Sequence, residues 1–216
     1  MNDPHAGQRV LHLGPPPRDA RGVLVMLHGR GASAESILSL FPELNVADVA
    51  ALAPQAAGHT WYPYSFLSPL PENQPYLDSA LRKVDAVVTG LLGDGIPPER
   101  IALLGFSQGA CLTGEYVARH PRRYGAVMAL TGGLIGPPGT PRSYPGSLDG
   151  TPVFLGTSDP DPHIPFERVL ETEAVMARMG AKVEVRRYEG MGHTINEEEM
   201  GVCGEMLQRM TTDKPQ

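Results

Sequence analysis

The sequence is poor in cysteine and in positive charge. It has two cysteines, Cys111 and Cys203, among 216 residues, too few for the disulfide framework of a small secreted domain. Its 24 acidic residues outnumber the 18 lysines and arginines, and the formal net charge is -6. The basic residues form no dense cluster. Nucleic-acid binding requires a basic surface, so we expect no nucleic-acid partner.

Long hydrophobic runs and targeting signals are also missing. Purely apolar runs such as residues 23–27 are far too short to span a bilayer, so no membrane span is expected. The first residues have neither the basic region nor the apolar stretch of a secretory signal peptide. These absences predict a cytoplasmic protein. No group of histidines and carboxylates has the spacing of metal ligands, so neither a metal nor another cofactor is expected.

Short apolar runs alternate with segments of helical periodicity along the whole chain. Strands are predicted at residues 8–13, 22–27, 46–53, 101–104, 126–130, 152–155 and 182–188. Helices are predicted from the N-cap Ser33 to residue 41, at 76–92, directly after residue 107, at 166–179 and at 197–210. This order predicts an α/β fold with a mostly parallel central sheet and helices on both faces. No repeat or linker is visible, so one domain is expected over residues 1–216.

Residues 101–112 combine an apolar strand, a tight turn and the start of a helix. The turn has glycines at 105 and 109 around Ser107 and matches the pattern G-x-S-x-G of a nucleophile elbow. Glycine is needed on both sides because a side chain there would crowd the neighbouring strand and helix. Ser107 would then lie at the carboxyl edge of the sheet, beside the free N–H groups of a helix N-terminus. The pattern predicts that Ser107 is a nucleophile.

Candidate partners for Ser107 follow two later strands. Asp159 and Asp161 follow the strand at 152–155, and His193 lies in a glycine-rich turn after the last strand. A serine hydroxyl needs a base that titrates near neutral pH, which histidine supplies, and a carboxylate orients that imidazole. The chain order serine, aspartate, histidine is the one used by α/β-hydrolases. Spacing alone leaves Asp159 and Asp161 as alternatives for the acid.

Two backbone N–H groups are expected to stabilise the oxyanion of the tetrahedral intermediate. One belongs to Gln108, directly after the nucleophile, and the other comes from the glycine-rich loop at Arg30 or Gly31. His28 precedes this loop and is interpreted as a structural anchor. The remaining histidines are expected at the surface or in loops: His5, His12, His59, His120 and His163.

Residues 55–75 follow no helical or strand periodicity and contain the one tryptophan of the chain. A long loop of this kind with many aromatic residues is typical of a functional segment. Aromatic and aliphatic walls suit an apolar acyl chain. A substrate pocket is therefore predicted from Trp61, Tyr62, Phe66, Leu134 and Met191. The exposed part of the loop could equally serve a homodimer.

Taken together, these motifs resemble the phospholipase/carboxylesterase family of α/β-hydrolases, which includes acyl-protein thioesterases and small bacterial carboxylesterases. The matching segments are residues 27–31, 105–109, 159–165 and 188–193, in the order of the family. The resemblance implies that Asp161, the aspartate of the block D-P-x-[VI]-P, is the triad acid. It also implies that the backbone N–H groups of Arg30 and Gln108 form the oxyanion hole, and that the Trp61 loop lines the acyl pocket.

The sequence thus predicts a serine esterase that cleaves short- to medium-chain carboxylic esters of small molecules through an acyl-enzyme. Thioesterase-type members usually carry an acidic residue where this chain has Ala32, and bulkier residues where it has Thr-Gly-Gly at 131–133. These departures favour a general carboxylesterase. The alternatives are hydrolysis of acyl-proteins or lysophospholipids, acyl transfer, and a non-catalytic binding protein on the same fold.

Overall fold

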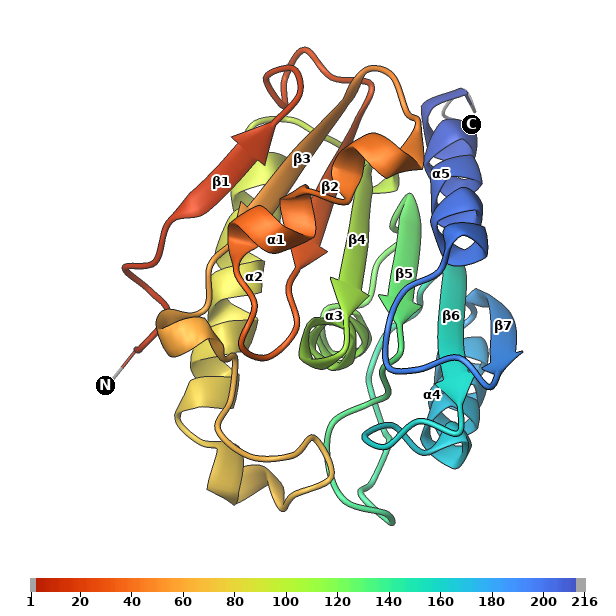
Figure 1. The fold of residues 1–216 in the computed structure, drawn as a ribbon. Helices are drawn as coiled ribbons and strands as arrows, with labels where there is room; N and C mark the ends of the chain where they lie inside the picture. Colours follow the sequence, from red (N-terminus) through yellow and green to blue (C-terminus); the bar gives the residue numbers. More distant parts are fainter. Residues whose placement is uncertain (1–2, 213–216) are drawn as a thin grey trace.

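The computed structural model describes residues 3–212 and contains one seven-stranded sheet (Figure 1). The strand order is β1-β3-β2-β4-β5-β6-β7; β1 is antiparallel to β3, and all other pairs are parallel. The strands are β1 (Val10–Leu13), β2 (Gly22–Leu27), β3 (Val49–Pro54), β4 (Ile101–Phe106), β5 (Ala126–Leu130), β6 (Pro152–Asp159) and β7 (Lys182–Glu189).

Helices cover both faces of this sheet, as predicted. α1 and α5 lie on one face, and α2, α3 and α4 lie on the other (Figure 1). Their bounds are α1 (Ala34–Leu38), α2 (Tyr76–Gly93), α3 (Gln108–Arg119), α4 (Phe166–Arg178) and α5 (Glu197–Thr212). Short 3-10 helices cover Phe41–Leu44, Ala57–His59, Leu70–Asn73 and Pro98–Arg100. Within residues 3–212, no helix combines the length and the apolar composition needed to cross a membrane.

The sheet separates two apolar cores. In β2, the side chains of Val23 and Val25 belong to the core under α2, α3 and α4. Leu24 and Met26 belong to the core under α1 and α5. Every residue of β2 is buried, because a central parallel strand is covered on both faces and has no solvent side on which polar residues could alternate.

The strand predicted at 46–53 begins later than expected. Asn45 and Asp48 have positive φ angles of 50° and 58°, and the chain turns there before β3 starts at Val49. Asparagine and aspartate tolerate this left-handed backbone better than other residues with side chains. The apolar pattern alone does not reveal the turn.

The strand predicted at 152–155 is longer than expected and reaches Asp159. It pairs with β7 in register up to Asp159 opposite Glu189, although its last residues are polar. The extension carries the following loop, with Asp161, to the carboxyl edge of the sheet, where β2, β4 and β5 also end (Figure 1). The loops after β2, β4, β5, β6 and β7, each of which carries a candidate residue, therefore meet at this edge.

Candidate active site

Ser107 stands at the tip of a strained turn between β4 and α3. Its backbone has φ 55° and ψ -118°, outside the regions that residues with side chains prefer. A Cβ on Gly105 would come within 2.2 Å of the carbonyl oxygen of Gly109. A Cβ on Gly109 would come within 2.1 Å of the carbonyl oxygen of Leu27. Both glycines are therefore required for β2, β4 and α3 to pack this closely around the serine.

The side chains of Ser107, His193 and Asp161 form a continuous hydrogen-bonded relay. His193 Nε2 is 2.8 Å from Ser107 Oγ, and His193 Nδ1 is 2.7 Å from Asp161 Oδ2. The carboxylate requires a proton on Nδ1, which leaves Nε2 as the acceptor facing the serine hydroxyl. This is the arrangement in which an imidazole can take the proton of an attacking serine.

The carboxylate of Asp161 is fully buried and saturated with donors. Its Oδ1 accepts the backbone N–H groups of His163 and Ile164, and its Oδ2 accepts the Ser158 hydroxyl in addition to His193. Burial by itself would raise the pKa of Asp161. The hydrogen bonds from His193 and from the two backbone N–H groups outweigh burial and hold this pKa below its ordinary value. The carboxylate therefore stays ionised beside the imidazole.

Asp159, the alternative acid, faces another partner. Its carboxylate is ion-paired with Arg187 of β7, and its backbone oxygen accepts the N–H of Gly190. Asp159 thus closes the end of the β6–β7 ladder, and it is Asp161 that contacts His193.

Within the described part of the chain, the two backbone N–H groups expected at the oxyanion hole, those of Arg30 and Gln108, are free to bind an oxyanion. Across residues 3–212, neither Arg30 N–H nor Gln108 N–H donates a hydrogen bond to the protein. Gln108 is the first residue of α3, where an N–H has no partner within the helix. Gly31, with φ 76°, turns the chain after Arg30, and its own N–H donates to the carbonyl of His59.

The side chains of Arg30 and Gln108 brace this loop against residues 60–64, a feature that the sequence patterns did not reveal. The guanidinium of Arg30 donates to the carbonyls of residues 63 and 64 at 2.7 and 2.5 Å. Gln108 Oε1 accepts the N–H of Trp61, and Gln108 Nε2 donates to the carbonyl of Tyr62. Trp61 Nε1 donates to the carbonyl of His28, at 2.8 Å. Residues 60–64 (the aromatic loop) therefore hold the loop of residues 28–31 (the oxyanion segment) and the start of α3 in position.

Of the five residues predicted to line a pocket, four lie in the interior. Trp61 and Leu134 have no exposed surface, Tyr62 is 1% exposed and Phe66 is 5% exposed. Met191 is half-buried, and its sulfur accepts a hydrogen bond from the side chain of Asn196. That these five residues line a substrate pocket stays a prediction, because the open cavity next to His193 is lined by other residues.

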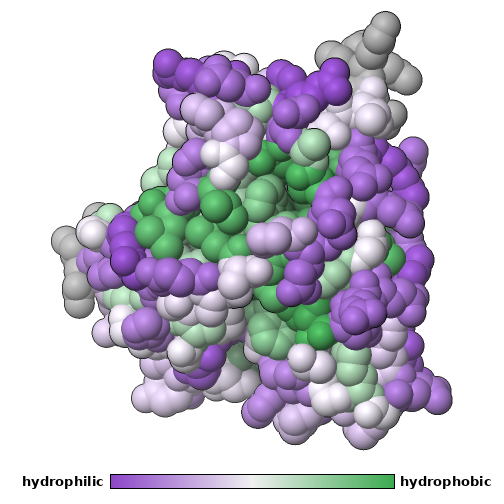
Figure 2. Space-filling model, turned by 45° about the horizontal axis from the view of Figure 1, so that its top comes forward, coloured by the Kyte–Doolittle hydropathy of each residue, from purple (hydrophilic) through white to green (hydrophobic). Residues whose placement is uncertain are grey.

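A cavity of about 320 Å³ opens next to His193, between α1 and the loop before α5. Figure 2 shows hydrophobic residues gathered in the middle of the face that carries α1 and α5, with hydrophilic residues around them. The cavity wall is mainly apolar and includes Gly29, Ile37, Leu40, Phe106, His193 and Ile195. Gly29 also packs against Ser107: a Cβ at Gly29 would meet the Ser107 Cβ at 3.4 Å. An apolar group attached to the reacting carbon could therefore enter this cavity.

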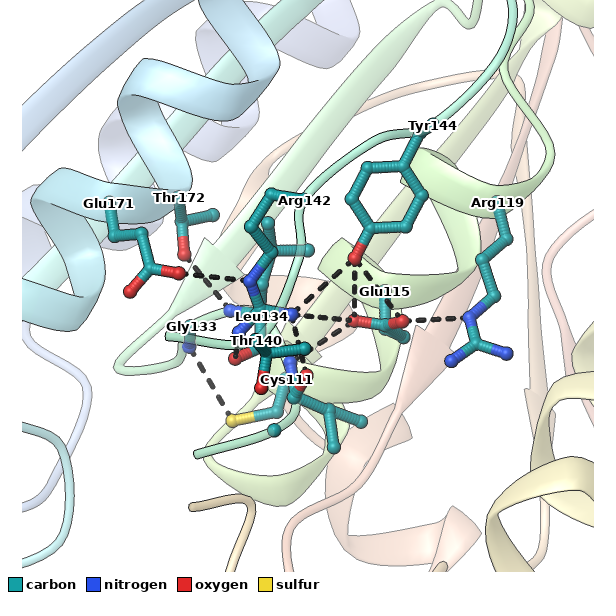
Figure 3. Close-up of polar contacts among 12 residues, drawn as sticks. Cys111, Glu115, Arg119, Gly133, Leu134, Thr140, Arg142, Tyr144, Glu171 and Thr172 are labelled. Atoms are coloured by element: carbon teal, nitrogen blue, oxygen red, sulfur yellow. Dashed lines mark hydrogen bonds and ion pairs between the residues drawn. The ribbon is translucent and has the colours of Figure 1, made fainter. Parts of the chain in front are cut away.

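A buried polar network fixes the loop that follows β5 (Figure 3). Glu115 of α3 accepts the backbone N–H of Ile135, and its side chain is only 2% exposed. Arg142 donates to the carbonyls of Leu134 and Ile135 and pairs with Glu171 of α4 at 2.9 Å. Because buried charges are tolerated only when they are paired, this network ties the loop to both helices.

Two histidines outside the relay are completely buried. His28 Nε2 accepts the N–H of Ala56, which agrees with its interpretation as a loop anchor. His5, expected at the surface or in a loop, lies in the N-terminal loop and is buried. Its Nε2 contacts the carbonyl of Trp61 and its Nδ1 accepts the N–H of Ala57, because the N-terminal segment packs under the aromatic loop. Burial lowers the pKa of both imidazoles, so both remain neutral near pH 7.

The sheet order, the strained serine turn and the placement of the relay at the carboxyl edge define an α/β-hydrolase fold. The model of the family Phospholipase/Carboxylesterase matches residues 12–211, so the chain belongs to this family. The predicted family resemblance and fold class are therefore confirmed.

The chain is similar to several proteins of known name. A crystal structure of a phospholipase/carboxylesterase from Dyadobacter fermentans superposes with a TM-score of 0.90 at 44% identity, covering 94% of this chain and 97% of that one. The carboxylesterase SOBER1 of Arabidopsis thaliana is 24% identical over 88% of this chain and 91% of its own length. Acyl-protein thioesterase 1 of Kluyveromyces lactis is 31% identical over 57% of this chain and 56% of its own. The protein is thus a hydrolase of the esterase type.

Proposed function

We propose that this protein hydrolyses carboxylic esters with short to medium acyl chains through an acyl-enzyme on Ser107. The observation that carries the proposal is the unbroken relay from Asp161 through His193 to Ser107, with distances of 2.7 and 2.8 Å. The acceptor-free N–H groups of Arg30 and Gln108 at the same turn support it further.

In the first half of the reaction, Ser107 Oγ attacks the ester carbonyl carbon while His193 Nε2 takes the hydroxyl proton. The oxyanion that forms accepts hydrogen bonds from the N–H groups of Arg30 and Gln108. The bond to the alcohol then breaks, and the imidazolium gives its proton to the departing oxygen. Asp161 orients the imidazole and stabilises its charged form in both transfers.

In the second half, water replaces the alcohol. His193 takes a proton from the water, whose oxygen attacks the acyl carbon, and the serine oxygen leaves with a proton returned by the imidazole. The products are a carboxylic acid and the free enzyme, and the cycle needs no oxidant or cofactor.

The proposed range of acyl length follows from the cavity. At about 320 Å³ the cavity is at the small end of the range typical of ligand pockets, which suits a short or medium acyl chain better than a full-length fatty acyl group. The apolar walls at Ile37, Leu40 and Ile195 suit a hydrocarbon better than a polar substituent.

Thioester cleavage is the second candidate, favoured by the similarity to acyl-protein thioesterase 1 of Kluyveromyces lactis. The same relay can expel a thiolate, so the two activities are separated by comparing one acyl chain in an oxygen ester and in a thioester. We expect the oxygen ester to give the higher kcat/KM, given the neutral Ala32 and the small residues at 131–133.

The test is hydrolysis of p-nitrophenyl esters from acetate to dodecanoate by the wild type, by Ser107→Ala and by Ser143→Ala. Ser143 is exposed in the loop after β5 and serves as the matched control. We expect a maximum at a short or medium chain, a loss of about 10⁴-fold or more in Ser107→Ala, and normal turnover in the control. Turnover that survives in Ser107→Ala would contradict the mechanism.

A further inference from the structure

The segment that carries His193 is sparsely packed. Gly190 and Gly192 are exposed, and a Cβ on either would have no neighbour within 4 Å. Thr194 is also exposed. The backbone on both sides of His193 therefore does little to fix its ring, and contacts made by the imidazole itself must hold it.

Two aromatic rings contact the imidazole of His193, in addition to its hydrogen bonds to the serine and the aspartate. Phe106 of β4 packs against it with centroids 5.3 Å apart at an interplanar angle of 40°. His163, from the loop between β6 and α4, packs edge-on with centroids 4.9 Å apart at 81°. Edge-to-face contact is a preferred geometry of aromatic pairs. His163 is otherwise exposed, and it does not line the cavity beside His193.

We propose that His163 is a positioning residue for the catalytic base: its imidazole packs edge-on against the His193 ring and holds that ring between Ser107 and Asp161. The inference rests on the proposed function, in which His193 is the base. Phe106 supplies the corresponding contact from the sheet side.

The contribution of the His163 ring can be separated from that of its backbone. The N–H of His163 donates to Asp161 Oδ1 at 2.7 Å, and this bond persists with any side chain other than proline. A substitution at His163 therefore leaves the acid of the relay in place and removes only the contact between the two rings. Because the side chain is exposed, the loss should barely change the stability of the fold.

The experiment compares His163→Ala, which removes the ring, with His163→Phe, which keeps an aromatic ring and removes the ring nitrogens. Aromatic pairs contribute enough that we expect kcat to fall roughly three- to tenfold in His163→Ala, with KM unchanged. His163→Phe should restore kcat to within about twofold of the wild type. The rate at which a fluorophosphonate labels Ser107 should follow kcat in all variants.

His120→Ala is the matched control. His120 is also a partly exposed histidine stacked on an aromatic ring, that of Tyr116 at 4.6 Å, but it lies at the opposite end of α3 from Ser107. Its removal should leave kcat and labelling unchanged.

Three results with the variants, and one with the wild type, overturn the inference. Wild-type kcat in His163→Ala shows that the ring positions nothing, and an equal loss in the Ala and Phe variants shows that packing is not the cause. A rise in KM without a fall in kcat assigns the ring to substrate binding instead. A wild type that neither hydrolyses esters nor reacts with the fluorophosphonate refutes the proposed function itself, and the inference falls with it.

Discussion

Glu199 is a buried carboxyl group that contacts Asn196, in the loop between β7 and α5 that also carries His193. It lies in the first turn of α5 and has no exposed surface. Its Oε2 accepts the N–H of Asn196, and its own N–H donates to Asn196 Oδ1. Its Oε1 lies over Gly156, within 2.2 Å of where a Cβ would stand, and has no hydrogen-bond partner among residues 3–212. An ionised carboxylate in this position is poorly compensated.

Burial raises the pKa of Glu199 from its ordinary 4.5 to about 7; the Asn196 N–H offsets part of this effect, and the charge of Glu198 adds to it. Below pH 4.5 the carboxyl is protonated in both the folded and the unfolded chain, and no stability is lost. Between pH 4.5 and 7 the unfolded chain ionises first, so the free energy of unfolding falls as pH rises. Above the folded pKa the loss is complete, at about 3 kcal/mol from about 1.4 kcal/mol per pKa unit.

Glu199→Gln keeps the shape of the side chain and cannot ionise, so it should not lose this stability. We expect the free energy of unfolding of the wild type, relative to Glu199→Gln, to drop by about 2 kcal/mol or more between pH 5 and pH 8. Urea denaturation of both proteins at pH 5, 6, 7 and 8 measures the difference directly.

Glu205→Gln is the control for this series. Glu205 lies on the same helix, is 66% exposed and pairs with Arg209, so its substitution should change stability little and equally at every pH. A stability difference between wild type and Glu199→Gln that is the same at pH 5 and pH 8 would refute the reasoning, because it would mean that the buried carboxyl does not change its charge in this range.

Three further changes test the site. Leu40→Trp fills the cavity beside His193, so kcat/KM for octanoyl relative to acetyl esters should fall roughly tenfold, and an unchanged ratio would place the acyl chain elsewhere. Gly109→Ala forces a Cβ against the carbonyl of Leu27 and should cost about 3 kcal/mol or more in urea denaturation, whereas wild-type stability would show that the elbow can relax. Asp161→Asn cannot hold the required imidazole tautomer and should lower kcat about 10⁴-fold with little change in the circular dichroism spectrum; a loss below tenfold would contradict its role.

The chain order of the elements could be predicted because their signals are local. The apolar run of β2 and the spacing of the glycines at 105 and 109 around Ser107 are patterns that can be recognised within a few residues. The boundaries were less predictable. β6 continues through polar residues to Asp159 because β7 lies beside it, and nothing within the segment itself indicates that partner.

Within the candidate site, the elements that carry the relay could be predicted, but several side-chain contacts could not. Asp159 and Asp161 lie two residues apart, and the difference between them arises from Arg187, which pairs with the first and leaves the second facing His193. The aromatic loop was expected to line a pocket, yet Trp61 is buried and braces the oxyanion segment through its indole N–H.

The sequence by itself determined the architecture and the position of the candidate nucleophile, because hydrophobic periodicity and the glycine pattern around Ser107 can be recognised within short stretches of the chain. Only the tertiary structure decided which charges pair, why Glu199 is poorly solvated and how His163 comes to lie against His193. Those contacts join residues that are tens of positions apart, and they arise only when the strands have assembled into one sheet.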